Sequence, residues 1–377
     1  MISVDEARDR ILVSLGATGP ETVPLAAGWN RVLARPVAAR LTQPPADVSA
    51  MDGYAVRAAD ATEGATLRLS GAAPAGKPFA GTVGAGEAVR IFTGGFVPEG
   101  ADAILLQEDA TAAEGSVRVN EAVTLGRHIR RRGLDFAEGA ELLPAGRRLT
   151  ARDIGLAAAG NHPWLTVHRR PRIGILATGD EIALPGEQLP SGGIVSSNAH
   201  ALAALVASGG GEASILPIAP DDPAEIAALA GSGGFDLLVT TGGASVGEHD
   251  LVQKALGQST TPGGFVLDFW QIAMRPGKPL IWGKLGAVPV LGLPGNPVSA
   301  LVCAVIFLLP ALARLQGLSD TATPTIRALA GVDLPANDKR ADHLRAKLVP
   351  GEGGEWIATP ASRQDSSMLA VLAGADA

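Results

Sequence analysis

The sequence predicts a multidomain α/β protein whose largest unit is a doubly wound α/β domain. At a prior of roughly 150 residues per domain, the 377 residues of the chain are too many for one compact core. Residues 171–320 alternate apolar, strand-like runs with helical segments, the pattern of parallel strands joined by crossover helices. Short strand-like runs punctuated by glycine and proline precede and follow this region, which predicts two smaller β-rich units.

The N-terminal part of the chain is expected to form two units, one inserted into the other. A helix over residues 3–15 opens with a serine and an acidic turn and carries apolar residues on one face. Residues 44–137 are typical of a β-rich domain, and residues 150–159 return to helix behind a threonine cap. Because helical pieces flank the β-rich segment, we expect residues 1–43 and 138–170 to form an elongated linking domain of helical and mixed character.

The α/β domain should cover residues 171–320, and a small terminal β domain should cover residues 321–377. Asp222 is the expected cap of one α/β helix. The expected strands cover residues 173–178, 213–218, 236–240 and 288–293, and the expected helices cover residues 198–207, 223–230 and 298–315.

The composition excludes several classes of protein. With 31 basic and 38 acidic residues, the net charge of −7 gives no general basic field, so we expect neither nucleic acid nor a membrane as partner. The single cysteine, Cys303, cannot form an internal disulfide, and the scattered histidines offer no zinc-type ligand set. The N-terminus lacks a signal-peptide pattern, and the longest apolar run, residues 300–309, stops at Pro310, short of the roughly 20 residues that a bilayer span needs. We therefore expect a cytoplasmic protein.

Three of the predicted strands end in unusual loops, and ligands of open α/β sheets bind beyond such ends. The first strand is followed by GDE, residues 179–181, the third by TGGASVGEHD, residues 241–250, and the last by LPGNPVSA, residues 293–300. Glycine-rich turns can present backbone N–H groups to phosphate or another oxyanion, or they can be a steric solution only. Asp250 and Asn296 could each cap a helix, and Asp250 could instead bind a divalent cation.

Positive charge is concentrated in two short segments. AMRPGKPL, residues 273–280, places Arg275 and Lys278 on a rigid turn, and RHIRRRGLDF, residues 127–136, is the densest basic cluster. Either segment could bind an anion, or could be solvated surface.

Two apparent catalytic motifs are rejected. Residues 71–77 fit the spacing of a phosphate-binding P-loop, but Pro78 replaces the Ser or Thr that would hold magnesium. Residues 243–247 fit the G-x-S-x-G pattern of serine hydrolases, which also need a histidine downstream. His249 lies too close in sequence for that role, and His343 belongs to the separate terminal unit.

Seven segments, taken together and in order, resemble those of one family, the molybdopterin molybdenumtransferases or MoeA proteins, which include the E domain of gephyrin. Each is weak alone, since the Asp-Gly of SAMDGYA, for example, could be only a turn. The C-terminal part is similar too, with Arg340 and Arg345 in RADHLRAKL and Ser366 in QDSSML. The seven are SAMDGYA (49–55), IFTGGFVPEGADAI (91–104), RRRGLDF (130–136), ATGDEI (177–182), TGGASVGEHD (241–250), MRPGKP (274–279) and LPGNPVSA (293–300).

The resemblance implies an elongated homodimer with a MoaB/Mog-like α/β domain and a small, β-barrel-like C-terminal domain. It implies that molybdate is inserted into adenylylated molybdopterin with Mg²⁺-dependent loss of AMP, the final step of molybdenum cofactor biosynthesis. The active cleft is then expected between the inserted unit and the α/β domain of different subunits. The adenylyltransferase that makes the substrate and proteins that mature molybdoenzymes are candidate partners.

The expected site residues combine the strand-end loops, the cationic segments and the family's functional positions. The catalytic residues are Asp52, Thr93, Asp135, Glu181 and Asp250. The substrate-binding residues are Arg130, Gly242, Gly243, Ser245, Gly247, Arg275, Lys278, Pro294, Gly295, Asn296, Arg345 and Ser366. The metal ligands are Glu181, Asp221 and Asp250. The chain departs from the family's pattern at Arg275, where many members have lysine, at Ala244, and at Asp365, which puts a negative charge beside Ser366.

Two other functions remain open. The molybdopterin adenylyltransferase has a similar α/β domain, but it would consume ATP and would lack the inserted β-rich unit. A non-catalytic dimeric scaffold, as in the gephyrin branch, would carry a further domain and a long linker, which nothing in the sequence resembles.

Overall fold

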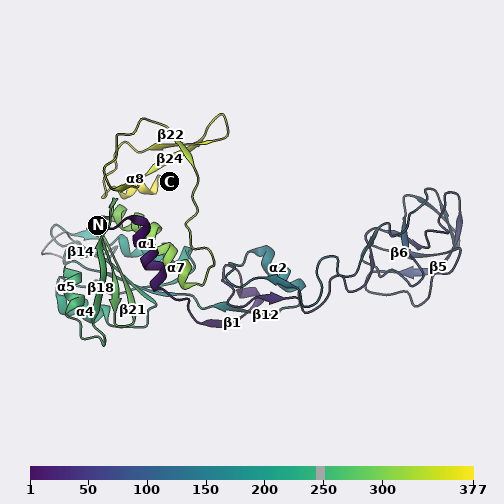
Figure 1. Ribbon diagram of the computed structural model, residues 1–377, viewed down its shortest axis with the longest axis horizontal. Helices are drawn as coiled ribbons and strands as arrows, with labels where there is room; N and C mark the ends of the chain where they lie inside the picture. Colours follow the sequence, from purple (N-terminus) through teal and green to yellow (C-terminus); the bar gives the residue numbers. More distant parts are fainter. Residues whose placement is uncertain (243–250) are drawn as a thin grey trace.

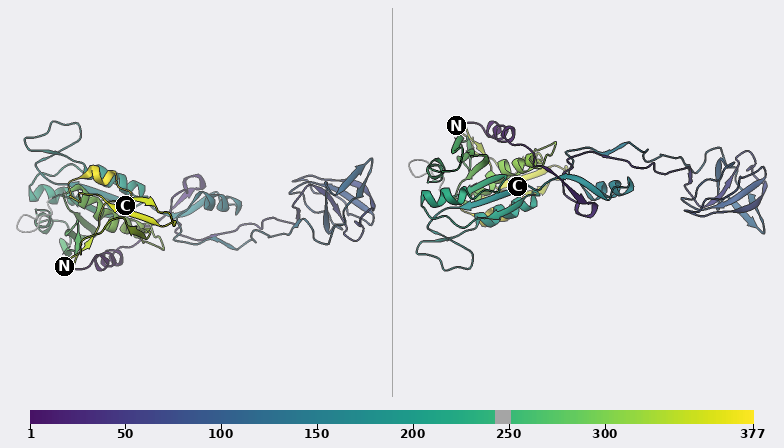
Figure 2. Two further views of the ribbon diagram at one scale, coloured as in Figure 1. Left: turned by 90° about the horizontal axis from the view of Figure 1, so that it is seen from above. Right: turned by 90° about the horizontal axis from the view of Figure 1, so that it is seen from below.

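The structure is a computed structural model that describes residues 1–242 and 251–377. The chain is elongated, with the α/β domain and the C-terminal unit at one end, the linking unit in the middle and the inserted unit at the other end (Figure 1). Figure 2 shows the two segments that connect the linking and inserted units running beside each other, so the chain enters and leaves the inserted unit on one side. The predicted multidomain α/β class is confirmed.

The first helix packs on the α/β domain and not in the linking domain, where the sequence analysis placed it. Helix α1 (Val4–Ser14) begins at Ser3, whose hydroxyl accepts the Glu6 N–H at 3.0 Å. A helix with an apolar stripe is stable when that stripe packs against another apolar surface. For α1, helix α7 (Leu309–Leu315) forms part of that surface. Ala7 and Ile11 of α1, and Leu15 directly after it, belong to the buried apolar core of the α/β domain.

The linking unit forms where the outgoing and returning parts of the chain pair with each other. Helix α2 (Ala151–Ala159) confirms the expected helix, and Thr150 and Asp153 form a capping box at its start. The turn η1 (Leu25–Ala27) lies between the first strand of one antiparallel pair and the first strand of the other. The antiparallel pairs are β1 (Pro20–Pro24) with β12 (Trp164–His168), and β2 (Val37–Ala38) with β11 (Glu141–Leu143).

The inserted unit is a mostly antiparallel six-stranded sheet of order β7-β4-β6-β5-β9-β8, so its expected β-rich character is confirmed. Apolar clusters cover both faces of this sheet. Strands β3 (Val48–Ser49) and β10 (Ile129–Arg130) pair where the chain enters and leaves the unit, which brings residues 49–55 close to residues 127–136. The sheet strands are β4 (Gly53–Val56), β5 (Thr66–Ala73), β6 (Glu87–Ile91), β7 (Ala103–Leu106), β8 (Ala110–Ala113) and β9 (Ser116–Val119).

The α/β domain is a six-stranded sheet of order β16-β13-β17-β21-β20-β18 with helices on both faces. The first four strands are parallel, as predicted. One apolar cluster joins the sheet to α1, α3, α6 and α7, and a second joins it to α4 and α5, so the doubly wound prediction is confirmed. Asp222 caps α4 as expected, accepting the N–H groups of Ala224 and Glu225. The elements are β13 (Arg172–Ala177), β16 (Glu212–Ile215), β17 (Leu237–Thr241), β18 (Phe265–Gln271), β20 (Pro279–Leu285), β21 (Val288–Leu293), α3 (Asn198–Ser208), α4 (Pro223–Ala230), α5 (Leu251–Gly257) and α6 (Pro297–Cys303).

The antiparallel strands β18 and β20 were not expected from the sequence. Strand β18 lies at the sheet edge and mixes buried with exposed residues, and Gly283 and Lys284 interrupt the apolar run of β20. Neither strand therefore shows the continuous apolar pattern by which the parallel strands were recognised.

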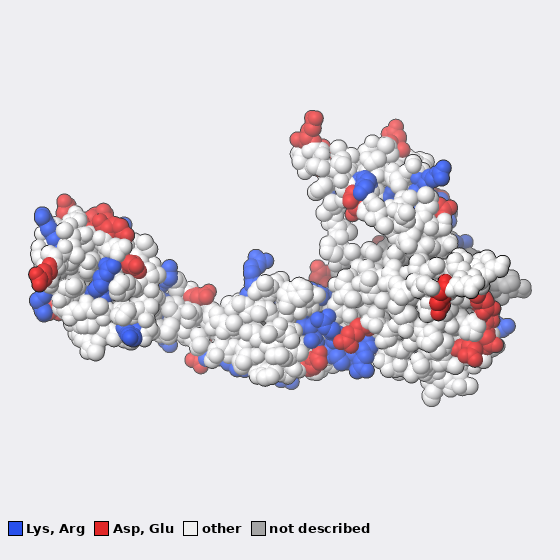
Figure 3. All heavy atoms as spheres, turned by 180° about the vertical axis from the view of Figure 1, so that it is seen from behind, with Lys and Arg blue, Asp and Glu red and all other residues white. Residues whose placement is uncertain are grey.

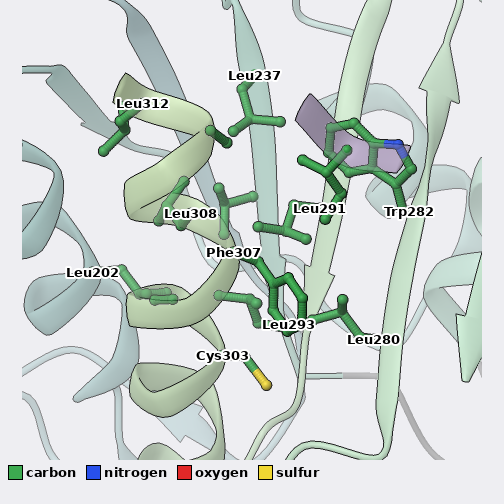
Figure 4. Packing of buried hydrophobic residues seen from close by; sticks show 14 of the residues in the cluster. Leu202, Leu237, Leu280, Trp282, Leu291, Leu293, Cys303, Phe307, Leu308 and Leu312 are labelled. Carbon is green, nitrogen blue, oxygen red and sulfur yellow. The ribbon is translucent and has the colours of Figure 1, made fainter. Parts of the chain in front are cut away.

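A helical segment from Pro297 to Leu315 occupies the centre of the larger core. It consists of α6, the π-helical turn η2 (Ala304–Leu308) and α7. Pro310 does not end it, because it lies in the first turn of α7, where a proline is tolerated. Within the described residues this is the one helix long and apolar enough to cross a membrane, and 61% of its apolar window is buried in the protein. Figure 4 shows Phe307 of this segment lying beside Leu280 and Leu293 of the sheet, within the buried cluster that also includes Leu308 and Leu312.

The C-terminal unit is sheet-rich, as expected, and among the described residues its sheet is an open one of three strands. The edge strand β22 (Ala328–Ala330) pairs with β25 (Trp356–Pro360), which pairs with β24 (Ala346–Pro350), and α8 (Leu369–Ala373) follows. Strand β23 (Ala341–Asp342) pairs instead with β19 (Met274–Arg275) of the α/β domain. This pairing seats the unit beside the strand-end loops.

Candidate functional site

A cavity of about 650 Å³, called here the first cavity, lies at the carboxyl ends of β13, β17 and β21. The loops after these strands and the start of α3 form its wall, together with the parallel pair β14 (Ile182–Ala183) and β15 (Ile194–Val195). Its lining includes five polar or glycine positions that come from four separate segments, namely Glu181, Asn198, Gly242, Gly295 and Asn296. The fold thus brings predicted substrate-binding positions together where the strand-end rule places a ligand.

Gly242 allows β17 to turn sharply at the cavity wall. Its φ is +97°, and a Cβ atom there would lie 2.5 Å from the carbonyl oxygen of Thr178. Only glycine fits this conformation and this close approach. The steric interpretation therefore holds for Gly242, whichever ligand the loop binds.

Asn296 and Ser366, predicted from separate motifs, lie in direct contact. Asn296 occupies the N-cap position of α6, as the capping alternative expects, but its side chain makes no capping hydrogen bond. Its Nδ2 instead donates to Ser366 Oγ at 3.0 Å, and the Ser366 carbonyl accepts the Val298 N–H at 3.0 Å. The C-terminal unit thus reaches the rim of the first cavity.

Three carboxylates gather near the first cavity, Asp180 and Glu181 from the loop after β13 and Asp221 from the segment before α4. Asp180 Oδ1 accepts the Asp221 N–H at 3.0 Å. Burial raises the pKa of Asp221, and the negative charges of Asp180 and Glu181 raise it further. In the described ranges no three His, Cys, Asp or Glu side chains converge as a metal site. The third predicted ligand, Asp250, lies outside those ranges.

A second cavity, of about 450 Å³, lies between the turn at residues 274–279 and the C-terminal unit. Its lining and that of the first cavity share Gly277, Pro279 and Ser299, so the two cavities adjoin. Four cationic side chains also line it, Arg275, Lys278, Arg340 and Arg345. A small oxyanion would fit such a lining.

Two of the four cations that line the second cavity are held in ion pairs, and two have no ion-pair partner in the part of the chain that the structure describes. Arg275, predicted to meet an anion, is held by Asp342, with Nε–Oδ1 at 2.9 Å and Nη2–Oδ2 at 2.5 Å, and this ion pair raises its pKa. Arg340 pairs with Asp338 at 2.6 Å. Among the described residues Lys278 has no ion-pair partner. This leaves Lys278 and Arg345 to meet an anion.

Arg345 is buried at the edge of the second cavity, with 2% of its surface exposed. Its Nη2 donates to the Asp365 carbonyl at 3.3 Å, whereas its Nε has no hydrogen-bond partner in the described part of the chain. Burial lowers the pKa of Arg345. The carboxylate of Asp365 accepts the N–H and hydroxyl of Ser367 at 2.8 and 2.6 Å, so its negative charge, a departure from the family, is taken up locally.

Asp52 and Thr93 form a second group of predicted site residues, in the inserted unit. Asp52 Oδ1 accepts the Thr93 N–H at 2.7 Å and the Thr93 hydroxyl at 2.8 Å, and these bonds lower the pKa of Asp52. The positive charge of Arg90 adds to this shift. The Arg90 guanidinium lies 5.0 Å from the ring centroids of both Tyr54 and Phe92.

The basic segment lies beside this group. Arg130 is exposed on β10, opposite Val48 of β3, and Asp135 is exposed with its N–H donating to the Gln43 carbonyl at 3.1 Å. Asp47 neutralises part of the segment by pairing with Arg131 at 2.6 Å. Arg130 is therefore an exposed cation on the strand pair that leads into residues 49–55.

The two groups of predicted site residues lie far apart within one chain. Asp52, Thr93 and Asp135 belong to the inserted unit, and Glu181 and Asp221 belong to the α/β domain at the opposite end (Figure 1). Figure 3 shows charges of both signs interspersed over one face of the inserted unit, and Lys and Arg gathered where the linking unit meets the α/β domain. A single chain does not bring the two groups together.

Some residues were predicted but not described, and others were missed. Gly243, Ser245, Gly247 and Asp250 lie outside the described residues. Two residues near the predicted sites were not expected from the sequence. Asn198 lines the first cavity, and Arg90, which belongs to no local motif, lies beside Tyr54 and Phe92. No role in the site was expected for His343, which lines the second cavity with its Nε2 buried and without a partner among the described residues. The serine-rich turn before Asn198 was the one available signal.

Comparison with known families covers most of the chain. Residues 2–160 match the MoeA N-terminal region (domain I and II), residues 174–314 match a probable molybdopterin binding domain, and residues 327–377 match the MoeA C-terminal region (domain IV).

Similar proteins cover nearly the full length. The molybdopterin molybdenumtransferase of Haemophilus influenzae is 36% identical over 360 residues, covering 94% of this chain and 88% of the relative. Molybdopterin molybdenumtransferase 2 of Mycobacterium tuberculosis is 38% identical over 357 residues, covering 92% and 88%. The crystal structure of the molybdopterin biosynthesis MoeA protein from Pyrococcus horikoshii superposes with a TM-score of 0.84 at 26% identity, covering 100% of this chain and 93% of that chain.

Proposed function

The chain belongs to the molybdopterin molybdenumtransferase (MoeA) family, a family of transferases in molybdenum cofactor biosynthesis, and from this we propose that it inserts molybdate into adenylylated molybdopterin with release of AMP. The observation that carries the proposal is the pair of adjoining cavities. The larger one suits an organic phosphoanhydride, and the smaller, cationic one suits a tetrahedral dianion. Their shared wall would place the two reactants side by side.

The first cavity supports the binding of the organic substrate. It combines apolar side chains, such as Ile182 and Ile194, with the backbone of the Gly242 and Gly295 loops. Apolar walls with a few placed polar groups are typical of sites for small organic ligands. Exposed peptide N–H groups in such loops hold phosphate oxygens.

The second cavity supports the binding of molybdate. Lys278 and Arg345 would supply positive charge, and Ser366 would supply a hydroxyl donor. Because Ser366 also contacts Asn296 of the first cavity, the dianion would lie next to the organic substrate. Arg275 would act mainly by holding Asp342 of the C-terminal unit in place.

The carboxylates near the first cavity fit a magnesium ion. Hard oxygen ligands are those that Mg²⁺ prefers. Burial, and then the charges of Asp180 and Glu181, raise the pKa of Asp221, and a bound cation would offset both effects. Glu181 and Asp221 would hold the ion, together with Asp250. The bound ion would supply charge neutralisation for phosphate oxygens.

The inserted unit would act on the α/β domain of a second copy. The group formed by Asp52 and Thr93 is remote from the α/β cavities of its own chain (Figure 1). In an isologous homodimer each chain would supply one half of each of two sites. Mixing Asp52→Ala with Lys278→Ala protein tests this at a low molybdate concentration, at which neither variant alone turns over. A mixed dimer would contain one intact site, so the mixture should regain about a quarter of wild-type activity. No recovery in a mixture shown to exchange subunits would contradict the shared site.

The reaction is tested with purified protein, adenylylated molybdopterin, molybdate and Mg²⁺. AMP release, measured by chromatography, and cofactor that activates an apo-molybdoenzyme are expected. No AMP release would overturn the proposal, and consumption of ATP with free molybdopterin would indicate the adenylyltransferase instead.

The Lys278→Ala variant tests the second cavity. Loss of a charge-assisted hydrogen bond should raise the molybdate KM by about tenfold or more. Lys284→Ala is the matched control, because Lys284 is an exposed lysine on the neighbouring strand β20, outside both cavities.

A further inference from the structure

We infer that Asn198 is a positioning residue, which turns the peptide groups of the loop at residues 294–296 so that two backbone N–H groups face the first cavity. The inference deepens the proposed function, because it assigns the part of that cavity that meets the anionic group of the substrate. Asn198 is the first residue of α3 and lines the first cavity.

The Asn198 amide group links two strand-end loops. Its Nδ2 donates to the Gly295 carbonyl at 2.7 Å and to Thr241 Oγ1 at 2.9 Å. The Thr241 hydroxyl donates onward to the Pro294 carbonyl at 3.4 Å. The Pro294 and Gly295 carbonyl groups therefore both point toward Asn198.

Peptide geometry then fixes the direction of the N–H groups. In a planar trans peptide the C=O and N–H bonds point in opposite directions. The Pro294 carbonyl shares its peptide unit with the Gly295 N–H, and the Gly295 carbonyl shares its unit with the Asn296 N–H. Both N–H groups therefore point away from Asn198, and neither donates to a described residue. Because Gly295 and Asn296 line the first cavity, these donors are available to a ligand there.

The side chain of Asn198 is not needed for its own helix. The N-cap of α3 is Ser197, which makes no side-chain capping bond, and both hydrogen bonds that the Asn198 side chain donates cross to other loops. Its Oδ1 is buried and has no partner within the described residues. The polar contacts of this side chain therefore serve the loop and not the helix.

The test compares Asn198→Asp with the wild-type protein. Aspartate keeps the shape but replaces the donor by a charged acceptor, which repels the Gly295 carbonyl. The matched control is His200→Ala, an exposed position two residues along α3 that lines neither cavity. AMP affinity is measured by isothermal titration calorimetry at matched fractions of folded protein, and a crystal structure of Asn198→Asp reports the orientation of the 294–296 peptides.

Asn198→Asp should bind AMP about tenfold or more weakly, because hydrogen bonds to a charged oxygen are lost, and its 294–296 peptides should rotate. His200→Ala should bind like wild type. Unchanged affinity or unrotated peptides in Asn198→Asp would overturn the inference. A wild-type protein that binds AMP but releases none from adenylylated molybdopterin would overturn the proposed function and leave the inference standing. A wild-type protein that binds no AMP would overturn both.

Discussion

Gly242→Ala tests whether the turn after β17 depends on a conformation that only glycine adopts. The substitution adds one methyl group at φ +97°, 2.5 Å from the Thr178 carbonyl oxygen. Since the obstructing atom belongs to the backbone after β13, no side chain can rotate away to make room. The ends of two parallel strands must therefore move apart, and the first cavity changes with them.

The expected cost follows from two contributions. A left-handed conformation costs a non-glycine residue about 1–2 kcal/mol, and relieving the contact adds backbone strain of about 1–3 kcal/mol. We expect the variant to lose about 2–5 kcal/mol of local stability at the strand ends. Its AMP affinity should fall as well, because the loop that lines the cavity is displaced.

Native-state hydrogen exchange read by mass spectrometry suits this question, because a chain of several units has no single unfolding free energy. Peptides that cover the ends of β13 and β17 should exchange faster in Gly242→Ala, and peptides of the inserted unit should not change. Gly257→Ala is the matched control, since a Cβ atom at Gly257, the last residue of α5, meets nothing within 4 Å. Equal protection of β17 in Gly242→Ala, Gly257→Ala and wild type would refute the steric reasoning.

Two further changes are expected to separate stability from function. Burial opposes ionisation of Asp236, but hydrogen bonds from Arg169, at 2.8 Å to each oxygen, and from the Arg172 N–H outweigh it and lower its pKa. That stabilisation is present above the unfolded pKa of about 3.9 and is lost as pH falls through the lower folded value. Asp236→Asn should therefore flatten acid unfolding of the α/β domain below about pH 5, and an unaltered profile would contradict this assignment. Ser366→Ala removes the contact with Asn296 and should raise the molybdate KM with little change in thermal stability, so a large loss of stability at unchanged KM would show a purely structural contact.

Local signals in the sequence determined much of the fold. Apolar runs at residues 173–178 and 288–293 predict buried parallel strands because such strands are covered on both faces, and the structure confirms them. The caps at Thr150 and Asp222 depend on residues a few positions apart and are likewise confirmed. The loops after the strands could be placed at one edge because parallel strands end on the same side.

Only the tertiary structure decided which distant groups meet. The partner of Arg275 is Asp342, 67 residues away, and the partner of Asn296 is Ser366, 70 residues away. The apolar face of α1 predicts burial but does not say against which unit, and it joins the α/β core. Periodicity and capping are set by neighbours in sequence, whereas these contacts depend on how whole units dock. The sequence by itself therefore determined the buried parallel strands and the loops that follow them. The docking of units decided which cations are paired, as Arg275 is with Asp342, and which, like Lys278, can meet a ligand.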